Sequence, residues 1–316
     1  MELEFIFVGG TGRSGTTVLS EILNDHSSCA RFDYELRFHI DPKGLFDLYQ
    51  GLCVNWDVYR GAQAAFDFAL FFEKLVSYSF YTYHKKILWK NSKEFYLDKL
   101  TQLYKDLGIT TEKRLWIGNS NLLAKTLSKI SLEVSDYLTP TFFCTYPVTK
   151  EIFCDSVSKF FKSLFAEDYV NINFVVEHTP YNFIYFEFLS DIFTNSKFIH
   201  IKRHPFDIVT SYSAQGWGSR YLSNNCKQIV ALYNMWLEKK KFLSNYIEIS
   251  LEDLQSNTAT TFDKLSEYLG LDRDGFSISS FDVGKSNINR WQVLQGSFEG
   301  LDCYADLREV ATKLGY

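Results

Sequence analysis

The N-terminal pattern of apolar and polar residues predicts a strand, a tight turn and a helix, in that order. Residues Phe5 to Val8 form an uninterrupted apolar run that ends at two glycines, which is typical of a buried parallel strand. After a glycine-rich stretch, apolar residues recur at helical spacing at Val18, Leu19, Ile22 and Leu23. Residues Thr16 to about Asn24 are therefore predicted to form the first helix.

The middle of the chain has a helical pattern, and strand-like runs return after it. Apolar residues recur with a period of about 3.6 residues over residues 64–83, 93–107 and 151–165. Short apolar runs typical of buried strands follow at residues 172–176, 197–202 and 246–249. Because no linker or repeat interrupts the chain, we predict one α/β domain over residues 1–316. It would have three layers, a central, mostly parallel sheet, and a mainly helical insertion over about residues 60–170, between the second and third strands.

The composition is that of a globular protein and lacks the charge of a nucleic-acid binder. Lys and Arg number 33 against 38 Asp and Glu, for a net charge of −5, whereas general nucleic-acid binders are basic. Aromatic residues reach 17%, with 29 Phe and 20 Tyr, and we interpret them mainly as core material. We therefore expect no nucleic-acid partner, and the oligomeric state stays open.

The sequence contains neither a membrane span nor a metal-binding cysteine pattern. No apolar run approaches the ~18 residues of a span, and the N-terminus lacks the features of a secretion signal. No metal-ligand spacing relates the six cysteines, Cys29, Cys53, Cys144, Cys154, Cys226 and Cys303. We expect buried thiols, no metal, no membrane partner and a reducing, cytoplasmic location.

A loop of glycines and hydroxyl residues, Gly-Gly-Thr-Gly-Arg-Ser-Gly-Thr-Thr over residues 9–17, lies between the predicted strand and helix. Free N–H groups and the helix dipole make such a loop an anion site. As G-x-G-x-x-G it matches a dinucleotide-binding turn, with Asp33 or Glu35 in place for a ribose contact. As G-x-x-x-x-G-K-[ST] it lacks the lysine, because Thr16 stands there. An NAD(P)-dependent oxidoreductase and a small-molecule kinase are therefore two alternatives.

A third interpretation centres on Arg13-Ser14-Gly15-Thr16-Thr17, in which an arginine, hydroxyls and amides would surround a single 5′-phosphate. A second motif supports it: residues 198–211 predict a strand, a turn and a helix start, with Pro205 suited to the first helical turn. Arg203 would leave the strand end while Ser211 comes from the helix about two turns later. Both can then bind one phosphate, which neither alternative predicts.

Together these motifs resemble those of the sulfotransferases that use 3′-phosphoadenosine 5′-phosphosulfate (PAPS). In that family [KR]-S-G-T-[TS] holds the 5′-phosphosulfate, and R-x-P-x-D-x-x-x-S binds the 3′-phosphate. Further segments similar to the family's are residues 177–180, 250–254, 265–271 and 285–291. The resemblance implies a P-loop-like fold and an in-line, metal-independent sulfuryl transfer that leaves 3′-phosphoadenosine 5′-phosphate (PAP). The loop arginine fits bacterial and tyrosylprotein-type members best.

The resemblance also implies which residues bind the donor. They are Gly12, Arg13, Ser14, Gly15, Thr16, Thr17, Arg203, Ser211, Lys285, Ser286 and Arg290. Two features depart from the family pattern: Leu251 replaces the usual Tyr, and the R-K-G-x-x-G-D-W block of cytosolic members is absent. The adenine contacts and the closing loop are therefore not assigned.

Two residues compete for the role of the base that removes the acceptor proton. Glu35 resembles the glutamate of tyrosylprotein and heparan sulfotransferases, including the E-x-R spacing to Arg37, although the two could also form a surface salt bridge. His178 has the H-x-P spacing of the catalytic histidine in cytosolic members. We predict Glu35 as the base and His178 at the sulfuryl group, with Arg13 as the third catalytic residue.

The acceptor is not written in a motif, because acceptor contacts come from variable helices and loops. We expect the acceptor to be a hydroxyl or amine of a small molecule from secondary metabolism, and guanidinium toxins are one class of such molecules. Arg37 and Trp217 are the predicted acceptor contacts, and a buried Trp217 that anchors its loop is the alternative.

Overall fold

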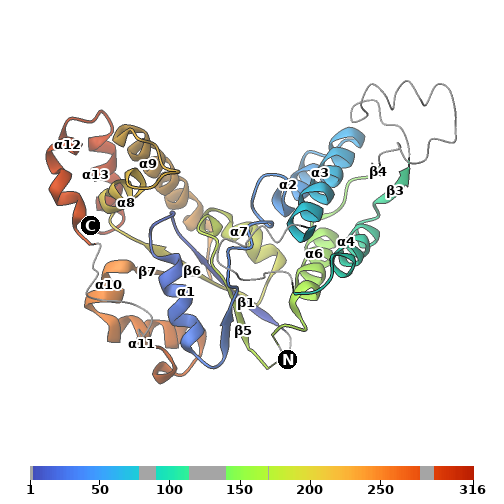
Figure 1. The fold of residues 1–316 in the computed structure, drawn as a ribbon, viewed down its shortest axis with the longest axis horizontal. Coiled ribbons are helices and arrows are strands. Elements are labelled where there is room, and N and C mark those ends of the chain that lie inside the picture. The colour runs from blue at the N-terminus through green and yellow to red at the C-terminus, as the bar shows by residue number, and fades with distance from the viewer. Residues whose placement is uncertain (1–2, 78–89, 114–139, 170, 278–287) are drawn as a thin grey trace. The chain divides into compact units, whose positions relative to one another are not determined.

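The computed structural model describes residues 3–77, 90–113, 140–169, 171–277 and 288–316. The chain forms two compact units, one made of residues 1–36 with 167–316 and the other of residues 37–166 (Figure 1). The first unit contains the five-stranded sheet. Within the described part of the chain, no helix has the length and apolar character needed to cross a membrane.

The central sheet is parallel throughout, as the α/β pattern predicts. Its strands are β1 (Glu4–Gly9), β2 (Cys29–Arg31), β5 (Phe174–Glu177), β6 (Lys197–Lys202) and β7 (Ile247–Ser250). They lie in the order β2-β5-β1-β6-β7, and every neighbouring pair runs in the same direction. The loops that follow β5, β1 and β6 therefore emerge side by side at one edge.

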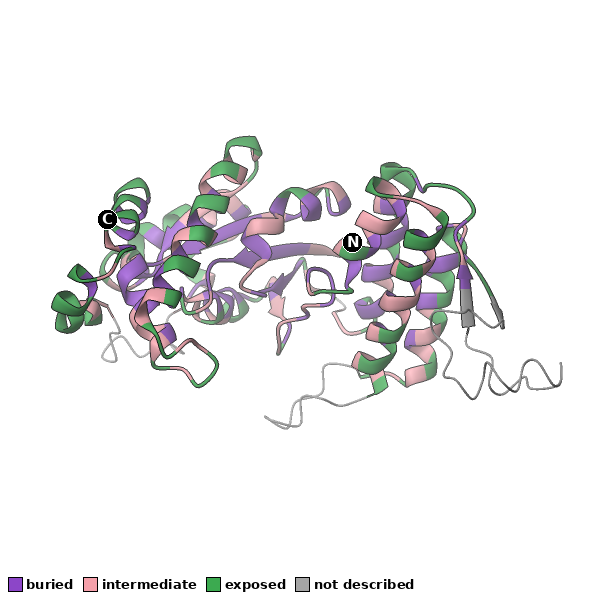
Figure 2. Cartoon of the chain, turned by 90° about the horizontal axis from the view of Figure 1, so that it is seen from above, coloured by how far each residue is buried: buried purple, intermediate pink, exposed green. Residues whose placement is uncertain are grey.

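Alternate residues of the strands face two helical layers, because side chains of a strand point to opposite faces in turn. Ile6 and Val8 of β1 share a buried core with α1 (Thr16–Asp25), α10 (Leu251–Ser256) and α11 (Thr258–Leu269). On the other face, Phe7 stacks on Phe198 with ring centroids 5.6 Å apart. That face packs against α7 (Asn182–Ile192) and α9 (Leu222–Lys239). Figure 2 shows the buried residues running through these strands, and the three-layer prediction is confirmed.

Short helices complete the first unit after β6. They are α8 (Pro205–Ser213), η4 (Lys240–Phe242), η5 (Arg273–Gly275), η7 (Arg290–Leu294), α12 (Gln295–Glu299) and α13 (Tyr304–Lys313). Pro205 is the first residue of α8, where its missing N–H costs no hydrogen bond.

The second unit is mainly helical. It contains α2 (Leu45–Tyr49), the π-helix η1 (Gln50–Val54), α3 (Val58–Ser77), α4 (Lys93–Asp106), the antiparallel pair β3 (Thr110–Lys113) and β4 (Pro140–Phe143), and α6 (Lys150–Phe165). The hydroxyls of Ser92 and Thr149 cap α4 and α6. Aromatic pairs such as Phe38 with Phe161, at 5.2 Å, fill its core.

Most predicted elements are confirmed, with shifted ends. The first helix extends one residue past the prediction, β6 has the predicted limits, and β5 begins two residues later than predicted. The predicted helix over residues 64–83 begins earlier, at Val58, and residues 78–83 lie outside the described residues. The predicted insertion follows a second strand of the sheet, which the structure locates at the three-residue β2. The β3–β4 pair was not predicted, and β3, with the sequence TTEK, has no apolar residue to mark it as a strand.

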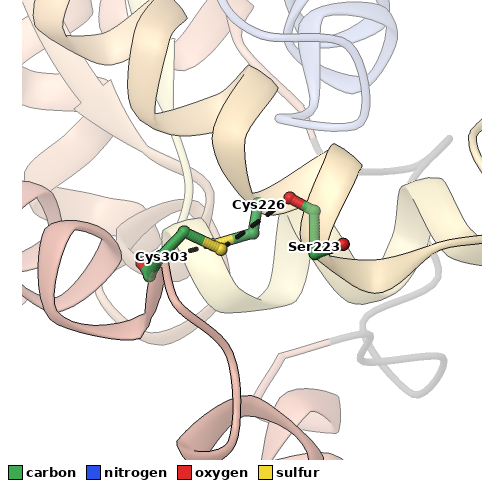
Figure 3. The surroundings of a disulfide bond; sticks show 3 residues. All are labelled: Ser223, Cys226 and Cys303. Carbon is green, nitrogen blue, oxygen red and sulfur yellow. Dashed lines mark hydrogen bonds between the residues drawn. A yellow bond between two sulfur atoms is a disulfide. The ribbon is translucent and has the colours of Figure 1, made fainter.

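The prediction of six thiols is wrong for two cysteines. Cys226 of α9 and Cys303, just before α13, form a disulfide with Cα atoms 6.4 Å apart (Figure 3). They are 77 positions apart in the sequence, so no local spacing of cysteines could predict the pair. The other four are free thiols, and burial raises the pKa of Cys29 and Cys53 to about 12.

Candidate active site

Three neighbouring strands of the sheet deliver the predicted site residues to one edge. His178 follows β5, the glycine loop follows β1, and Arg203 follows β6. The backbone N–H of Gly10 donates to the carbonyl of Pro180 at 2.6 Å, which joins the loop to the segment that carries His178. The carboxyl edge of a parallel sheet is where α/β proteins bind ligands, so the position favours a ligand site.

The glycine loop leaves the first turn of α1 without a capping side chain. Gly15 precedes the helix with φ 106°, in the left-handed region that favours glycine, and offers no capping side chain. Ser14 is buried, and its hydroxyl and N–H both donate to the carbonyl of Thr11, at 2.6 and 3.1 Å. Gly10 has no room for a Cβ, which would meet the carbonyl of Ile201. The amides in the first turn of α1 can therefore receive an anion.

The structure brings together residues from the two predicted phosphate motifs. Arg13 Nε donates to the hydroxyl of Ser211 at 3.0 Å, and Arg203 Nη1 donates to the carbonyl of Arg13 at 3.0 Å. Arg13 itself has φ 68°, which turns its backbone so that carbonyl and side chain both reach the β6–α8 segment. Two guanidinium groups and a hydroxyl thus lie beside the open start of α1.

Arg203 is a buried cation, only 4% exposed. Burial lowers the pKa of Arg203, and the charges of Asp207 and Glu252 oppose that effect; an arginine stays protonated at neutral pH. Its Nη2 lies 4.0 Å from Asp207, which is a loose ion pair. The carboxylate of Asp207 instead accepts the backbone N–H groups of Asn289 and Trp291, at 2.7 and 3.1 Å. A simple Arg203–Asp207 pair therefore does not account for this motif.

The late segment of the predicted donor site is only partly described. Arg290 lies in η7 between the two residues that donate to Asp207, and it is exposed. Trp291 stacks on His204, with ring centroids 5.2 Å apart, which holds η7 against the β6–α8 turn. Lys285 and Ser286 lie outside the described residues.

His178 is a buried and neutral histidine. Burial lowers the pKa of His178 to about 4; Glu177 opposes that effect and Arg31 adds to it. Among the described residues, no group lies within hydrogen-bonding distance of its Nδ1. A neutral imidazole can donate one hydrogen bond to an oxygen anion, but it carries no charge to that oxygen at neutral pH.

The remaining predicted residues lie in three different places. Glu35 is half-buried and follows β2 in the first unit. Arg37 belongs to the second unit, where its Nε binds Asp41 at 2.9 Å. Trp217 is 63% exposed and meets Tyr212 edge-on at 4.9 Å, so it is not a buried loop anchor.

Sequence reasoning missed the tyrosines and the carboxylate that support the site. Tyr233 of α9 donates to the carbonyl of Arg203 at 3.2 Å. The hydroxyl of Tyr212 lies so close to Gly12 that a Cβ at that position would meet it at 2.6 Å. Glu177 accepts several hydrogen bonds at the end of β5. Of these residues, only Tyr212 could have been found from the sequence, because it directly follows Ser211 of the second motif.

The strand order argues against the dinucleotide-binding alternative. In that fold the second strand of the chain lies directly beside the first, and its terminal acid reaches the ribose. Here β5 lies between β1 and β2, so an acid that follows β2 does not end a strand adjacent to β1. In the described part of the chain, no three His, Cys, Asp or Glu side chains form a metal-binding group.

Comparison with known proteins identifies the family. A model described as the sulfotransferase family matches residues 5–275. The chain is similar to the sulfotransferase domain from the Synechococcus PCC 7002 olefin synthase, at 13% identity and a TM-score of 0.51, over 99% of this chain and 94% of that one. It is also similar to the sulfotransferase domain from the curacin biosynthetic pathway, at 15% identity and a TM-score of 0.47, over 99% and 98%. A search of curated proteins finds no match. Since the family model covers most of the 316 residues, this chain belongs to the sulfotransferase family.

Proposed function

We propose that this sulfotransferase uses PAPS as its donor and a hydroxyl or amine of a small molecule as its acceptor. The observation that carries the proposal is the meeting of Arg13, Arg203 and Ser211 beside the open start of α1. That arrangement offers one anion site at the helix start and a second between the two arginines and the hydroxyl. A nucleotide with both a 5′- and a 3′-phosphate fits two such sites.

The buried position of Arg203 makes the second site selective. The Arg203 guanidinium, held at 4% exposure with its Nη2 4.0 Å from Asp207, offers a buried positive charge to a dianionic phosphate. The hydroxyl of Ser211 accepts the Nε–H of Arg13, which leaves its own O–H able to donate to the phosphate. Charge-assisted bonds of this kind contribute about 1.5 to 3 kcal/mol each, enough to distinguish PAP from a nucleotide without the 3′-phosphate.

PAPS would supply the sulfuryl group and a phosphate leaving group. The amides of Thr16 and Thr17 and the side chain of Arg13 would then stabilise the negative charge on the leaving oxygen. Glu35 would accept the acceptor proton. His178, neutral because it is buried, would donate a hydrogen bond to a sulfuryl oxygen.

The finer assignments belong to the same proposal. We propose one sulfotransferase domain over residues 1–316 with its helical insertion, and a transfer that needs no metal ion. Arg37 and Trp217 would contact the acceptor. Lys285, Ser286 and Arg290 would bind the nucleotide of the donor. A role in secondary metabolism is part of the same proposal. A cytoplasmic location is also proposed. Disulfides are unusual in a reducing compartment, so a count of the cysteines that are free in the unreduced protein tests this location as well.

Calorimetry with PAP and 5′-AMP tests the donor assignment. Arg203→Ala should weaken PAP binding by a factor of about 10 to 150 and leave AMP binding nearly unchanged, because only PAP carries the 3′-phosphate. Arg273→Ala is the matched control, since it removes the same charge from η5, where Arg273 pairs with Asp263. Equal losses for PAP and AMP would contradict the assignment, as would no binding of PAP to the unaltered protein.

A further inference from the structure

We propose that Glu177 is a positioning residue that holds the segments of Glu35 and His178 at a set separation. The proposal rests on the function proposed above, in which these two residues act on the acceptor and the sulfuryl group. Glu177 is the last residue of β5 and is fully buried. A buried carboxylate is retained only where its oxygens are well hydrogen-bonded.

One oxygen of this carboxylate binds both catalytic segments. Oε1 accepts the N–H of Leu36 at 3.1 Å and the N–H of Thr179 at 3.1 Å. The first N–H belongs to the peptide that follows Glu35, and the second to the peptide that follows His178. The two residues are 143 positions apart, and one atom thus ties the backbone of both.

The other oxygen joins this link to the sheet. Oε2 accepts a short hydrogen bond from Asn182 Nδ2, which also donates to the carbonyl of Val8 at 3.2 Å. Val8 lies near the end of β1, just before the glycine loop. The hydroxyl of Thr179 adds a further bond to Oε1, at 2.5 Å. Through these hydrogen bonds, Glu177 fixes the position of both segments relative to β1, the strand that precedes the glycine loop.

The chemistry of the contacts requires a carboxylate at this position. The four groups described above that bind it are all donors: two backbone N–H groups, a hydroxyl and an amide N–H₂. An ionised carboxylate is acceptor-only, whereas a glutamine would place N–H₂ against one of these donors. Turning the amide of Asn182 to compensate would set its oxygen against the carbonyl of Val8. A neutral substitute therefore leaves at least one buried donor unsatisfied.

Glu177 also acts on the charge state of its neighbour. Its negative charge raises the pKa of His178 against the effect of burial. Replacement by glutamine removes this effect and lowers the pKa of His178 further. A residue with a purely structural role, distant from His178, would leave that pKa where it is.

Glu177→Gln tests the proposal, with Glu248→Gln as the matched control. Glu248 is a half-buried carboxylate that also accepts from several donors, on Trp236 and Lys240, but it lies on β7 away from both segments. Both variants should lower the free energy of unfolding. Only Glu177→Gln should speed amide exchange at Leu36 and Thr179 and lower the pKa of His178 in an NMR titration. Exchange and titration identical to the unaltered protein would overturn the proposal.

The second measurement is kinetic: the rate at which PAP is released from PAPS, with 4-nitrophenol or water as the acceptor. Misplaced catalytic groups can cost about 100-fold, so Glu177→Gln should lower kcat about 10- to 100-fold while the KM for PAPS and the affinity for PAP stay unchanged. An unchanged kcat, or a loss of PAP affinity that matches the loss of kcat, would overturn the proposal. If Glu177→Gln does not fold, Thr179→Val, which removes one donor to Oε1, should show the same pattern more weakly. A protein that neither binds PAP nor turns over PAPS would instead refute the proposed function, while amide exchange and titration still decide the role of Glu177.

Discussion

Acidification should destabilise this protein through His178, because its imidazole is buried in the neutral form. In the unfolded chain a histidine has a pKa near 6.5, whereas burial lowers the pKa of His178 in the folded protein to about 4. Between these two values the unfolded state binds a proton that the folded state does not. The stability from the neutral ring is therefore present above pH 6.5 and is lost as the pH falls toward 4.

The size of the effect follows from the difference between the two pKa values. Each pKa unit corresponds to about 1.4 kcal/mol, so a difference of about 2.5 units gives about 3.5 kcal/mol once both states are fully protonated, of which about 3 kcal/mol is lost by pH 4. Glu177, whose charge opposes the burial effect, is already included in that pKa. Burial also lowers the pKa of His200 and His204, so the whole protein should lose more than His178 alone accounts for.

Urea unfolding of the unaltered protein and of His178→Gln, at several pH values from 8 to 4, isolates this residue. The other histidines are common to both proteins, and their effects cancel in the difference. The free-energy difference between the two should be constant above pH 7 and should then move by about 3 kcal/mol in favour of His178→Gln as the pH reaches 4. Parallel curves over the whole range would show that His178 titrates normally in the folded protein and would refute the reasoning.

Two further measurements test the base and the cysteines. Glu35→Gln keeps the shape of the side chain but removes the base, so kcat should fall by about 10² to 10⁴ while PAP affinity stays the same; Asp33→Asn, a neighbouring exposed acid, is the control, and a near-normal rate for Glu35→Gln would move the base to His178. Alkylation of the unfolded, unreduced protein should label four cysteines, and six after reduction, because Cys226 and Cys303 form a disulfide; six labelled cysteines without reduction would contradict that bond.

Elements with a strong local period were readable from the sequence. The first strand and helix, α4, α6 and β6 all lie where the apolar pattern predicts them, because a helix or a buried strand imposes its own spacing on the residues that form it. β2 has only three residues, and β3 consists of polar residues alone, whereas the equally short β5 and β7 contain the apolar residues that mark a buried strand. β2 forms because β5, far away in the sequence, pairs with it, and β3 forms because β4 pairs with it; such pairing leaves no trace in the local pattern of residues.

The candidate active site likewise has one part that the sequence predicts and another that only the tertiary structure determines. Its motif residues were found from the sequence because a phosphate needs N–H, hydroxyl and guanidinium donors at a fixed spacing along a strand, turn and helix. The contacts between motifs come from the order of the strands: β1 lies between β5 and β6, which sets Gly10 against Pro180 and Arg13 against Ser211. Glu177 shows the limit most clearly, since its partners include Leu36, 141 positions away. A buried carboxylate is identified only by the donors that surround it, and the fold alone brings those donors together.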